Sequence, residues 1–536
     1  MTSQPQLSTT AADAPEAELA PAPVAPGERT TARTEPAVDT ELTPAGRGLW
    51  HRLGRPPRKP LTIGFVGSLM LVVGGFGAGG VLVHDPILEG TPLVAWRFGH
   101  GFQLASMATY AGLGLVVWAW VMLGRAVLAH RVRARAVLTS ALLWVLPMLV
   151  SPPLFTRDPF SYLADGALPL RGFDPYAVGP DVLTGPIPDN VHWFWHETPA
   201  PYGPLFIAAA KAVVSLTGEN MIAGVVLMRL TMAVGLVLFV AALPGLTRHL
   251  GGRLPVTLWM AMANPITIVL LVGGAHNDLL VLGFLSTGTL LMLNGRHASG
   301  LALTCLAAAV KATAGLALPF LVLVWAARLE GSPKVRLTKA IAAGVAVFVV
   351  VFAACSLAGG VGIGWLNAVN APSTITNWLS LPTGLGQALF NVANAIFGGV
   401  PQTPFIIVTR VIGVLLFLYL AVKQWLAARD GGPDAVRRAG VVLLLFALLS
   451  PATLPWYYTW GMSLLVAAAW SKRGMQVVIF ASVFLIIGAF PNGEVSLYAF
   501  GFMILGMAGA LLAAVSLSSP DPLRLRSPRR RPAPDG

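Results

Sequence analysis

The residues most able to do chemistry lie in a polar segment, 151–204, between two apolar stretches. Ionisable side chains beside lipid are costly and tend to mark functional sites. A carboxylate there can take the proton from an attacking hydroxyl group, so the segment predicts a site for a polar, glycosidic ligand. A solvated acidic loop is the alternative interpretation. Its aspartates, and the aromatic residues that accompany them, include Asp158, Asp165, Asp174, Asp181, Asp189, Tyr162, Tyr176, Trp195 and Tyr202.

Two further polar groups interrupt apolar sequence. His276, Asn277 and Asp278 stand at the mouth of two apolar segments. A His-x-Asp pair can bind a divalent ion or a phosphate, but two side chains do not define a metal site, and a structural turn is the alternative. Lys311 must pair, snorkel or face a cavity. We expect it near the outer tip of a helical hairpin, where it would meet a lipid phosphate.

Two uncharged stretches carry groups suited to sugars. Residues 359–403 contain no Asp, Glu, Lys or Arg, and their polarity comes from amides and hydroxyls around Asn377 and Trp378. Such groups beside indole rings suit sugar hydroxyls and ring faces, although a loop lying on the membrane surface is equally compatible. Trp456 and Tyr457 in SPATLPWYYTW (450–460) are either an aromatic membrane anchor or a stacking platform.

The elements that must position these groups are membrane helices. The chain is 55% hydrophobic and 11% charged, against about 25% charged residues in soluble domains. Apolar runs near the length of one bilayer crossing recur from Leu61 onward. We therefore predict an all-α polytopic membrane protein with about 13–15 hydrophobic helices, the site being formed by loops on the outer face. Some predicted segments are short for a complete crossing, so the sequence leaves the number of spans open. The predicted segments include 136–150, 204–217, 254–273, 298–313 and 315–329.

The charge distribution predicts the topology. The net charge of +13 comes from basic residues spread over many short turns, which are typical of cytoplasmic loops. This pattern excludes nucleic acid as the expected partner and indicates membrane lipids. We expect a disordered cytoplasmic segment over 1–48, the membrane domain over 49–520 and a basic tail over 521–536. Two cysteines in apolar runs indicate no disulfide framework, and the absence of a P-loop disfavours ATP-driven transport.

A family resemblance joins these features. RDPFSYLADG…GFDPYAVGP…TPAPYGPL resembles the first outer loop of GT-C membrane glycosyltransferases. The nearest likeness is to the actinobacterial polyprenyl-phosphomannose-dependent α-1,6-mannosyltransferases that extend lipomannan and lipoarabinomannan. NP…GGAHND (264–278), Lys311 with Pro319, NWLSLPTGLG (377–386) and SPATLPWYYTW follow in the same order. The likeness covers about residues 60–518.

This resemblance implies about 13 spans, an outer-face site and a polyprenyl-phosphate mannose donor held in the bilayer. It also implies inversion, from a β-linked donor to an α-linked product on a lipid-anchored mannan acceptor. The family's base is an acid in the first outer loop of the catalytic core, a position that Asp158 matches. Two spans precede this loop here, where many GT-C enzymes have one. Members differ in metal dependence, so a divalent cation stays open.

The resulting hypothesis is a mannosyltransferase of the cell membrane with its active site outside. Asp158 is the expected base, and Asp165 or Asp174 would orient the acceptor or bind a metal. The rivals are a GT-C transferase for another sugar or acceptor, and a flippase or transporter of lipid-linked sugars. Polar residues concentrated in outer loops favour an enzyme over a transporter. The donor-phosphate or metal candidates are Arg157, Asp165, Asp174, His276, Asp278 and Lys311, and the sugar-binding candidates are Tyr162, Tyr176, Tyr202, Asn377, Trp378, Trp456 and Tyr457.

Overall fold

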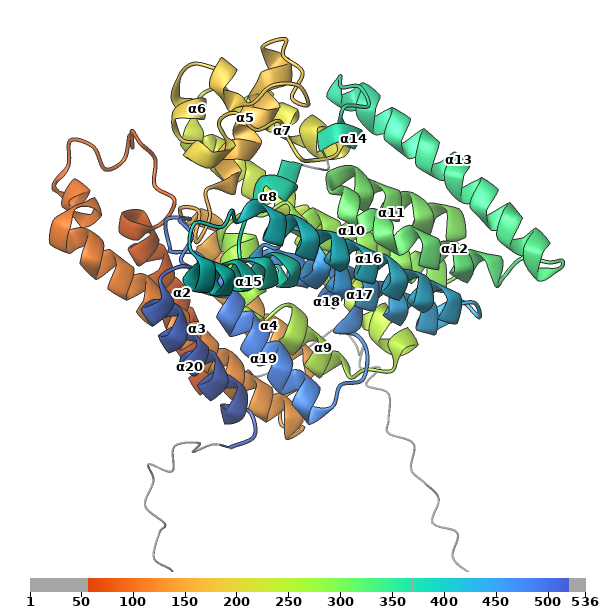
Figure 1. Cartoon of the computed structure of the whole chain (residues 1–536). Helices are drawn as coiled ribbons and strands as arrows, with labels where there is room; N and C mark the ends of the chain where they lie inside the picture. Colours follow the sequence, from red (N-terminus) through yellow and green to blue (C-terminus); the bar gives the residue numbers. More distant parts are fainter. Residues whose placement is uncertain (1–55, 369–370, 520–536) are drawn as a thin grey trace, which may run out of the picture. The chain divides into compact units, whose positions relative to one another are not determined.

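The computed structural model describes residues 56–368 and 371–519, and in these ranges every regular element is helical (Figure 1). Extended pairing in the described ranges is limited to two isolated bridges, Gly251 with Ala468 and Ala489 with Val495. The prediction of an all-α polytopic membrane protein is therefore confirmed. The predicted disordered segment 1–48 and basic tail 521–536 lie outside the described residues, and the domain boundaries stay predictions.

Within the described ranges, five helices are long and apolar enough to cross a membrane. A helix of 16 residues such as α10 rises about 24 Å, which is short of the roughly 30 Å hydrocarbon core. The number of complete crossings among the shorter helices therefore stays a prediction. The five long helices are α2 (Arg58–Ala78), α3 (Gly99–Leu128), α8 (Met221–Leu250), α13 (Pro333–Gly359) and α16 (Thr403–Ala427).

Shorter helices and single turns make up the rest. The apolar ones are α4 with η2 (Ala134–Val150), α7 (Pro204–Thr217), α10 (Asp278–Leu293), α11 (His297–Val310), η6 with α12 (Ala312–Ala326) and α20 (Phe500–Ser516). The others are α5 (Asp158–Leu170), α6 (Pro186–Asp189), α14 (Trp365–Ala368), α15 (Leu381–Phe397), α17 (Gly432–Leu449), α18 (Tyr458–Leu465) and α19 (Lys472–Ile486). Short turns are η1 (Pro92–Arg97), η3 (Pro180–Val182), η4 (Trp193–Trp195), η7 (Ala371–Thr374) and η8 (Pro455–Tyr457).

Two predicted segments differ from the structure. The apolar segment 254–273 is broken into α9 (Leu254–Ala261) and η5 (Ile266–Gly273), which bend by 47°. Pro265 lacks an N–H group, and the side-chain oxygen of Asn264 accepts the Ile266 N–H at 3.0 Å, so both residues interrupt the helical hydrogen bonds. The predicted loop 359–403 also needs correction. It contains α15, whose Ser380 hydroxyl caps the first turn by accepting from the Thr383 N–H.

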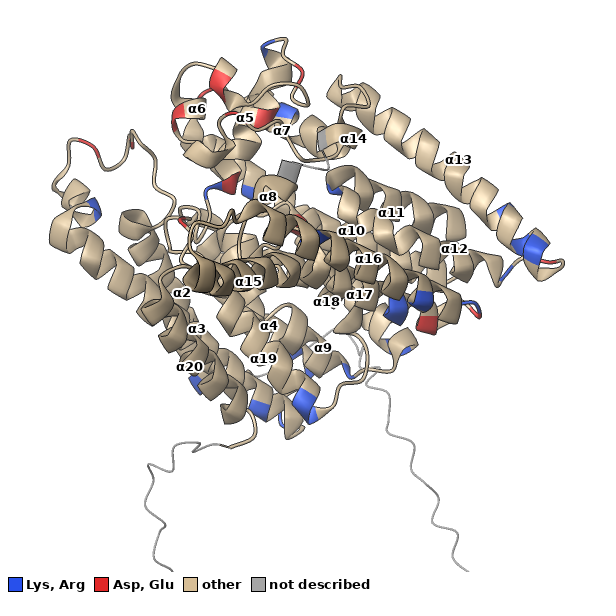
Figure 2. Cartoon of the chain, in the orientation of Figure 1, with Lys and Arg blue, Asp and Glu red and all other residues tan. Residues whose placement is uncertain are grey.

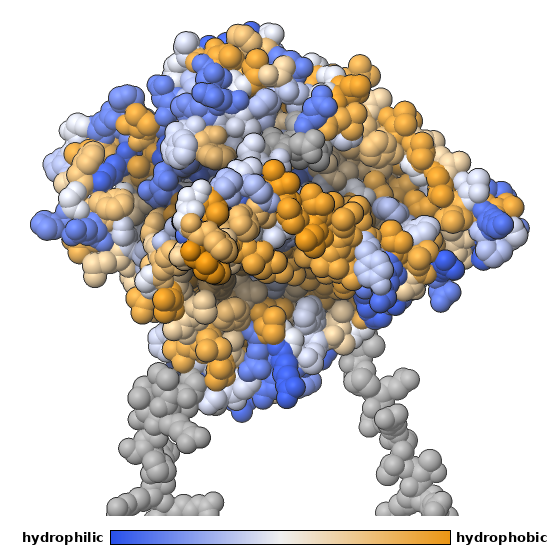
Figure 3. Space-filling model, viewed as in Figure 1, coloured by the Kyte–Doolittle hydropathy of each residue, from blue (hydrophilic) through white to orange (hydrophobic). Residues whose placement is uncertain are grey.

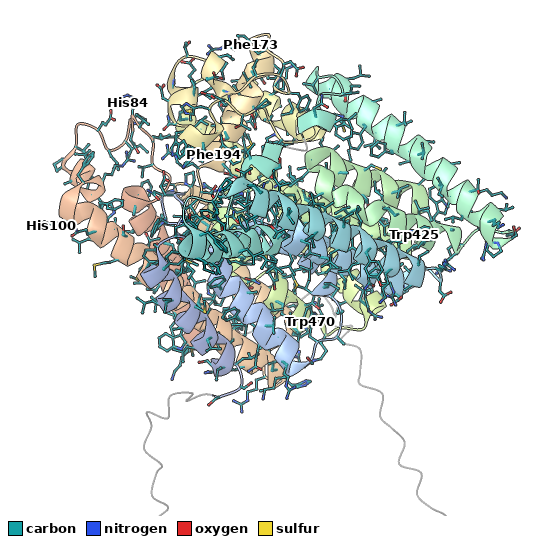
Figure 4. The ribbon with its side chains drawn as sticks, viewed as in Figure 1. His84, His100, Phe173, Phe194, Trp425 and Trp470 are labelled. Carbon is teal, nitrogen blue, oxygen red and sulfur yellow. The ribbon has the colours of Figure 1, made fainter. Side chains whose placement is uncertain are left out.

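The two ends of the helical bundle differ in the charge of their side chains. Figure 2 shows Asp and Glu gathered around α5 and α6, whereas most Lys and Arg lie near α9, α17, α19 and the start of α13. A wide apolar surface lies between the two ends, over α15 and α16 (Figure 3). Phe173 and Phe194 accompany the acidic end and Trp470 the basic end (Figure 4). This pattern is typical of a membrane protein with aromatic residues at both interfaces.

Close packing between α8 and α10 determines where the residues around His276 lie. Gly235 on α8 and Gly283 on α10 face each other, because a Cβ on Gly283 would lie 2.3 Å from the Gly235 carbonyl oxygen. Small residues permit such close backbone approach in membrane bundles. The buried Arg229 guanidinium, also on α8, donates to the carbonyl oxygens of Leu149, Val272 and Gly273 at 3.0–3.1 Å. These contacts fix the end of η5, directly before His276.

Candidate functional site

The site is centred on the first turn of α5. Pro159 follows Asp158 in this turn, where its missing N–H group has no helical partner to lose. The Asp158 backbone N–H donates to the Thr156 hydroxyl at 3.1 Å. A helix N-terminus carries partial positive charge and stabilises a carboxylate. The Asp158 side chain is 18% exposed, so the carboxylate is sheltered but reachable.

His276 and Tyr162 contact this carboxylate. His276 Nδ1 lies 3.4 Å from Asp158 Oδ2, and the Tyr162 hydroxyl lies 3.4 Å from the same oxygen. Burial raises the pKa of Asp158, but the hydrogen bond and charge of His276, followed by Lys311 and Thr156, hold it below its ordinary value. Asp158 is therefore ionised at neutral pH, which is the form that a base requires.

A second carboxylate begins another helix. Asp278, fully buried in the first turn of α10, accepts from Lys311 Nζ at 3.0 Å on both oxygens and from the indole N–H of Trp460. Lys311 ends α11 in extended conformation, and its side chain is 12% exposed. An ammonium group has three donors, so pairing with Asp278 leaves Lys311 able to donate to an incoming anion.

Aromatic side chains surround the ammonium group. Lys311 Nζ lies 5.5 Å from the Trp460 ring centre and 5.7 Å from those of Tyr202 and Tyr457. Ring faces attract cations at such distances. Trp456 packs on His276 with ring centres 4.0 Å apart. Together these groups hold the positive charge at a fixed place.

These side chains border one cleft, with about 820 Å³ of space not filled by protein atoms, part of it open to solvent. One wall comes from α5, and a second comes from the loop that ends at Tyr202. The other walls come from the turn after Lys311 and from η8 with α18. The lining residues are Asp158, Ser161, Asp165, Pro180, Trp195, Thr198, Pro201, Tyr202, Lys311, Ala312, Thr313, Ile375, Leu454, Trp456, Tyr457 and Trp460.

The structure brings together many of the residues predicted from the sequence. Asp158, Asp165, Tyr202, Lys311, Trp456 and Tyr457 line the cleft. Tyr162, His276 and Asp278 support it from behind through the contacts above. Among the described side chains, His276 Nε2 and both polar atoms of Asn277 are buried without a hydrogen-bond partner. The second ring nitrogen of His276 is thus not engaged by the described protein groups.

Other residues that were predicted to belong to the site do not line the cleft. The Arg157 guanidinium donates to the carbonyl oxygens of Val81 and Asn190 at 2.9–3.3 Å, so it ties three loops together. Asp174 is exposed and accepts the Tyr176 N–H in a local turn. Asn377 donates to the Thr453 carbonyl oxygen and Trp378 to that of Leu497. Arg157, Asp174, Tyr176, Asn377 and Trp378 are not among the cleft-lining residues.

Some polar and aromatic residues line the cleft although they were not among the site residues predicted from the sequence, among them Ser161, Thr198 and Trp460. Ser161 follows Asp158 by three positions, and Trp460 follows Trp456 by four, spacings that place side chains on one helix face. This spacing could have identified both. Thr198 lies in an irregular loop and gave no such signal. Among the described residues, no group of three or more His, Cys, Asp or Glu side chains is placed to hold a metal ion.

The turn between α19 and α20 packs against the segment that leads into Asp158. The Phe155 N–H donates to the Pro491 carbonyl oxygen at 2.9 Å, and Glu494 lies 3.2 Å from His192 Nε2. Gly493 has φ +93°, and a Cβ there would lie 2.9 Å from the Thr156 carbonyl carbon. Only glycine adopts this conformation readily. The turn 491–494 thus presses against the residues directly before Asp158.

We expect Gly493→Ala to lower both stability and turnover. The unfavourable φ costs about 1–2 kcal/mol, and displacement of Asp158 by about 1 Å can lower kcat by roughly 10²-fold. Gly90→Ala is the matched control, since Gly90 has φ +76° but open space around it. It shares the backbone cost and leaves Asp158 in place. Thermal unfolding and turnover of both purified variants check this, and equal turnover would show that the turn does not position Asp158.

Comparison with known proteins identifies the family. A family model described as "Alpha-(1→6)-mannopyranosyltransferase, N-terminal domain" matches residues 61–327, and one described as "MptB C-terminal domain" matches residues 382–519. The chain is 38% identical to α-(1→6)-mannopyranosyltransferase A of Mycobacterium tuberculosis over 92% of this chain and 97% of the relative. The chain belongs to the α-(1→6)-mannopyranosyltransferase family. The predicted resemblance is thereby confirmed.

Two relatives from Corynebacterium glutamicum extend the comparison. α-(1→6)-Mannopyranosyltransferase A is 31% identical over 83% of this chain and 96% of the relative. α-(1→6)-Mannopyranosyltransferase B is 29% identical over 83% and 81%. No solved structure matches the chain. As a member of this mannosyltransferase family, the protein builds its cleft from both matched regions: Asp158 and Lys311 belong to the first and Trp456 and Trp460 to the second.

Proposed function

We propose that this mannosyltransferase takes mannose from polyprenyl-phosphate mannose and adds it, with inversion, to a growing α-1,6-mannan on a lipid anchor. The observation that carries the proposal is that an ionised carboxylate, Asp158, and a cation, Lys311, which is held by Asp278 and surrounded by aromatic rings, line the same cleft. One group suits an attacking hydroxyl and the other suits a leaving phosphate.

The reaction follows from this arrangement. Asp158 takes the proton of the acceptor hydroxyl, and the freed oxygen attacks the anomeric carbon of mannose. The bond from that carbon to the phosphate oxygen breaks, and polyprenyl phosphate leaves with the electron pair. Lys311, held by Asp278 and Trp460, stabilises the charge that grows on the phosphate. A phosphate leaving group needs no protein acid, so one base suffices, unlike the two opposed carboxyls of a glycosidase.

The distribution of charged residues supports an outer-face site. Basic residues gather at the end of the bundle opposite to α5 and α6 (Figure 2), and basic loops stay in the cytoplasm. We therefore place the cleft on the outer side of the plasma membrane, where a donor carried in the bilayer reaches it. Exposed apolar residues along α16, such as Ile407, Val411 and Leu415, suit contact with lipid.

A reconstituted assay tests the donor. The purified full chain in detergent receives a synthetic α-1,6-dimannoside and either polyprenyl-phosphate mannose or a nucleotide-linked mannose. We expect transfer from the lipid-linked donor alone, with an α-1,6 linkage in the product by NMR. Transfer from the nucleotide sugar would contradict the proposed donor. Absence of transfer in detergent, together with movement of the lipid-linked sugar across vesicle membranes, would favour a flippase.

A further inference from the structure

The cleft-facing side of α5 carries more polar groups than the proposed chemistry uses. Ser161 and Asp165 line the cleft beyond Asp158, and their residues are 9% and 3% exposed. The Ser161 hydroxyl is buried without a hydrogen-bond partner among the described residues. Buried polar groups are nearly always hydrogen-bonded, so this hydroxyl, with the Asp165 carboxyl one helical turn further along the same cleft wall, indicates the place of a ligand.

The environment of Asp165 favours its neutral form. Burial, followed by the charge of Asp158, raises the pKa of Asp165 to about 8. Burial first, and then nearby carboxylates, also raise the pKa values of Tyr176 and Tyr202, so both phenols are neutral. On α7, which packs against α5, the Lys211 ammonium donates to the Gly359 carbonyl oxygen. Asp181 in the adjoining turn η3 is exposed to solvent.

The neutral carboxyl group of Asp165 suits an uncharged ligand that can both donate and accept hydrogen bonds. It offers one O–H donor together with acceptor oxygens, which matches a sugar hydroxyl that both donates and accepts. A phosphate would meet repulsion from Asp158, and a cation would lack a negative charge on Asp165 itself. Trp195, also on the cleft wall, is held by edge contact with Phe194 at 4.8 Å between ring centres. Its indole adds a flat apolar face for a sugar ring.

Position on the helix separates this group from the base. Asp165 follows Asp158 by seven residues, which is about two turns or roughly 10 Å along α5. The two carboxyls can therefore contact two successive sugars of one extended acceptor.

We propose that Ser161, Asp165 and Trp195 form a second sugar subsite, which binds the mannose next to the one whose hydroxyl Asp158 deprotonates. This inference rests on the proposed function and adds the residues that recognise the acceptor. Asp165 acts there by binding and does not touch the reacting atoms.

Binding and turnover with acceptors of two lengths test the subsite. The purified full chain receives octyl mannoside or octyl α-1,6-dimannoside, and tryptophan fluorescence gives Kd without any donor. Asp165→Leu is expected to weaken dimannoside binding about tenfold or more and to leave the monomannoside Kd unchanged. Asp165→Asn, which keeps a donor and an acceptor, should retain binding. Thermal unfolding shows whether each variant is folded.

The pH dependence provides a readout that a purely structural role would not give. Asp165 loses its proton as the pH rises through about 8, so the wild-type Kd for dimannoside should increase above that pH. Asp165→Asn should remove this increase. Equal effects of Asp165→Leu on both acceptors, or an unchanged pH profile in Asp165→Asn, would overturn the subsite. These binding results stand apart from mannosyl transfer, whose absence in the wild type would count against the proposed function alone.

Discussion

Asp158→Asn should lower mannosyl transfer by about 10²–10⁴-fold, the range expected when a general base is removed. The amide keeps the size of the side chain and can still accept from Tyr162, but it cannot take a proton. The loss should appear in kcat, while binding of the donor stays close to that of the wild type. Initial rates with polyprenyl-phosphate mannose and dimannoside measure it.

Asp189→Asn is the matched control for this variant. Asp189 lies in the same polar segment and is exposed, outside the cleft-lining residues. It undergoes the same exchange of carboxyl for amide and should retain normal turnover. If Asp158→Asn also retained near-normal turnover, Asp158 would not be the base, and the proposed mechanism would be wrong.

Lys311→Met should lower kcat by about 10²–10³-fold, as is typical when a group that stabilises developing negative charge is removed. Methionine retains much of the side-chain length but carries no charge for the leaving phosphate. The substitution also leaves Asp278, which is fully buried, as an unpaired carboxylate. Breaking a buried pair in this way costs about 3–5 kcal/mol, so stability should fall as well.

A double variant separates the two effects. In Lys311→Met with Asp278→Asn, both charges are gone, and the amide oxygen still accepts from the Trp460 indole. Thermal unfolding should return toward the wild type while transfer remains low. Recovery of transfer together with stability would show that Lys311 serves only to neutralise Asp278.

The sequence predicted the site residues best where a charged residue stands within or directly beside an apolar segment. Asp158, Asp278 and Lys311 each stand where a charged group in membrane helices needs a partner or a cavity, and the structure places them around one cleft. The pairing of Asp278 with Lys311 and the contact of Asp158 with His276 could not be read from the sequence, because they depend on the close packing of α8 and α10 and on the extended backbone at Lys311.

Neutral hydrogen-bonding residues were harder to interpret. An amide or indole has the same donors whether it binds a sugar or a carbonyl oxygen of the chain. Asn377 and Trp378 bind the carbonyl oxygens of Thr453 and Leu497 and thus fasten the segment before α15 to the loops beside the cleft. Arg157 likewise holds loops rather than lining the cleft. Local sequence cannot distinguish these roles, because the carbonyl partners lie far away along the chain.

The starts of α5 and α10 have one further consequence. Both carboxylates, Asp158 and Asp278, sit in the first turn of a helix, where backbone dipoles contribute to their stabilisation. Dissolved ions screen exposed charges over about 10 Å, but they act much less on buried groups. The charges of Asp158 and Asp278, whose side chains are 18% and 0% exposed, are therefore screened less by added salt than charges on the protein surface are.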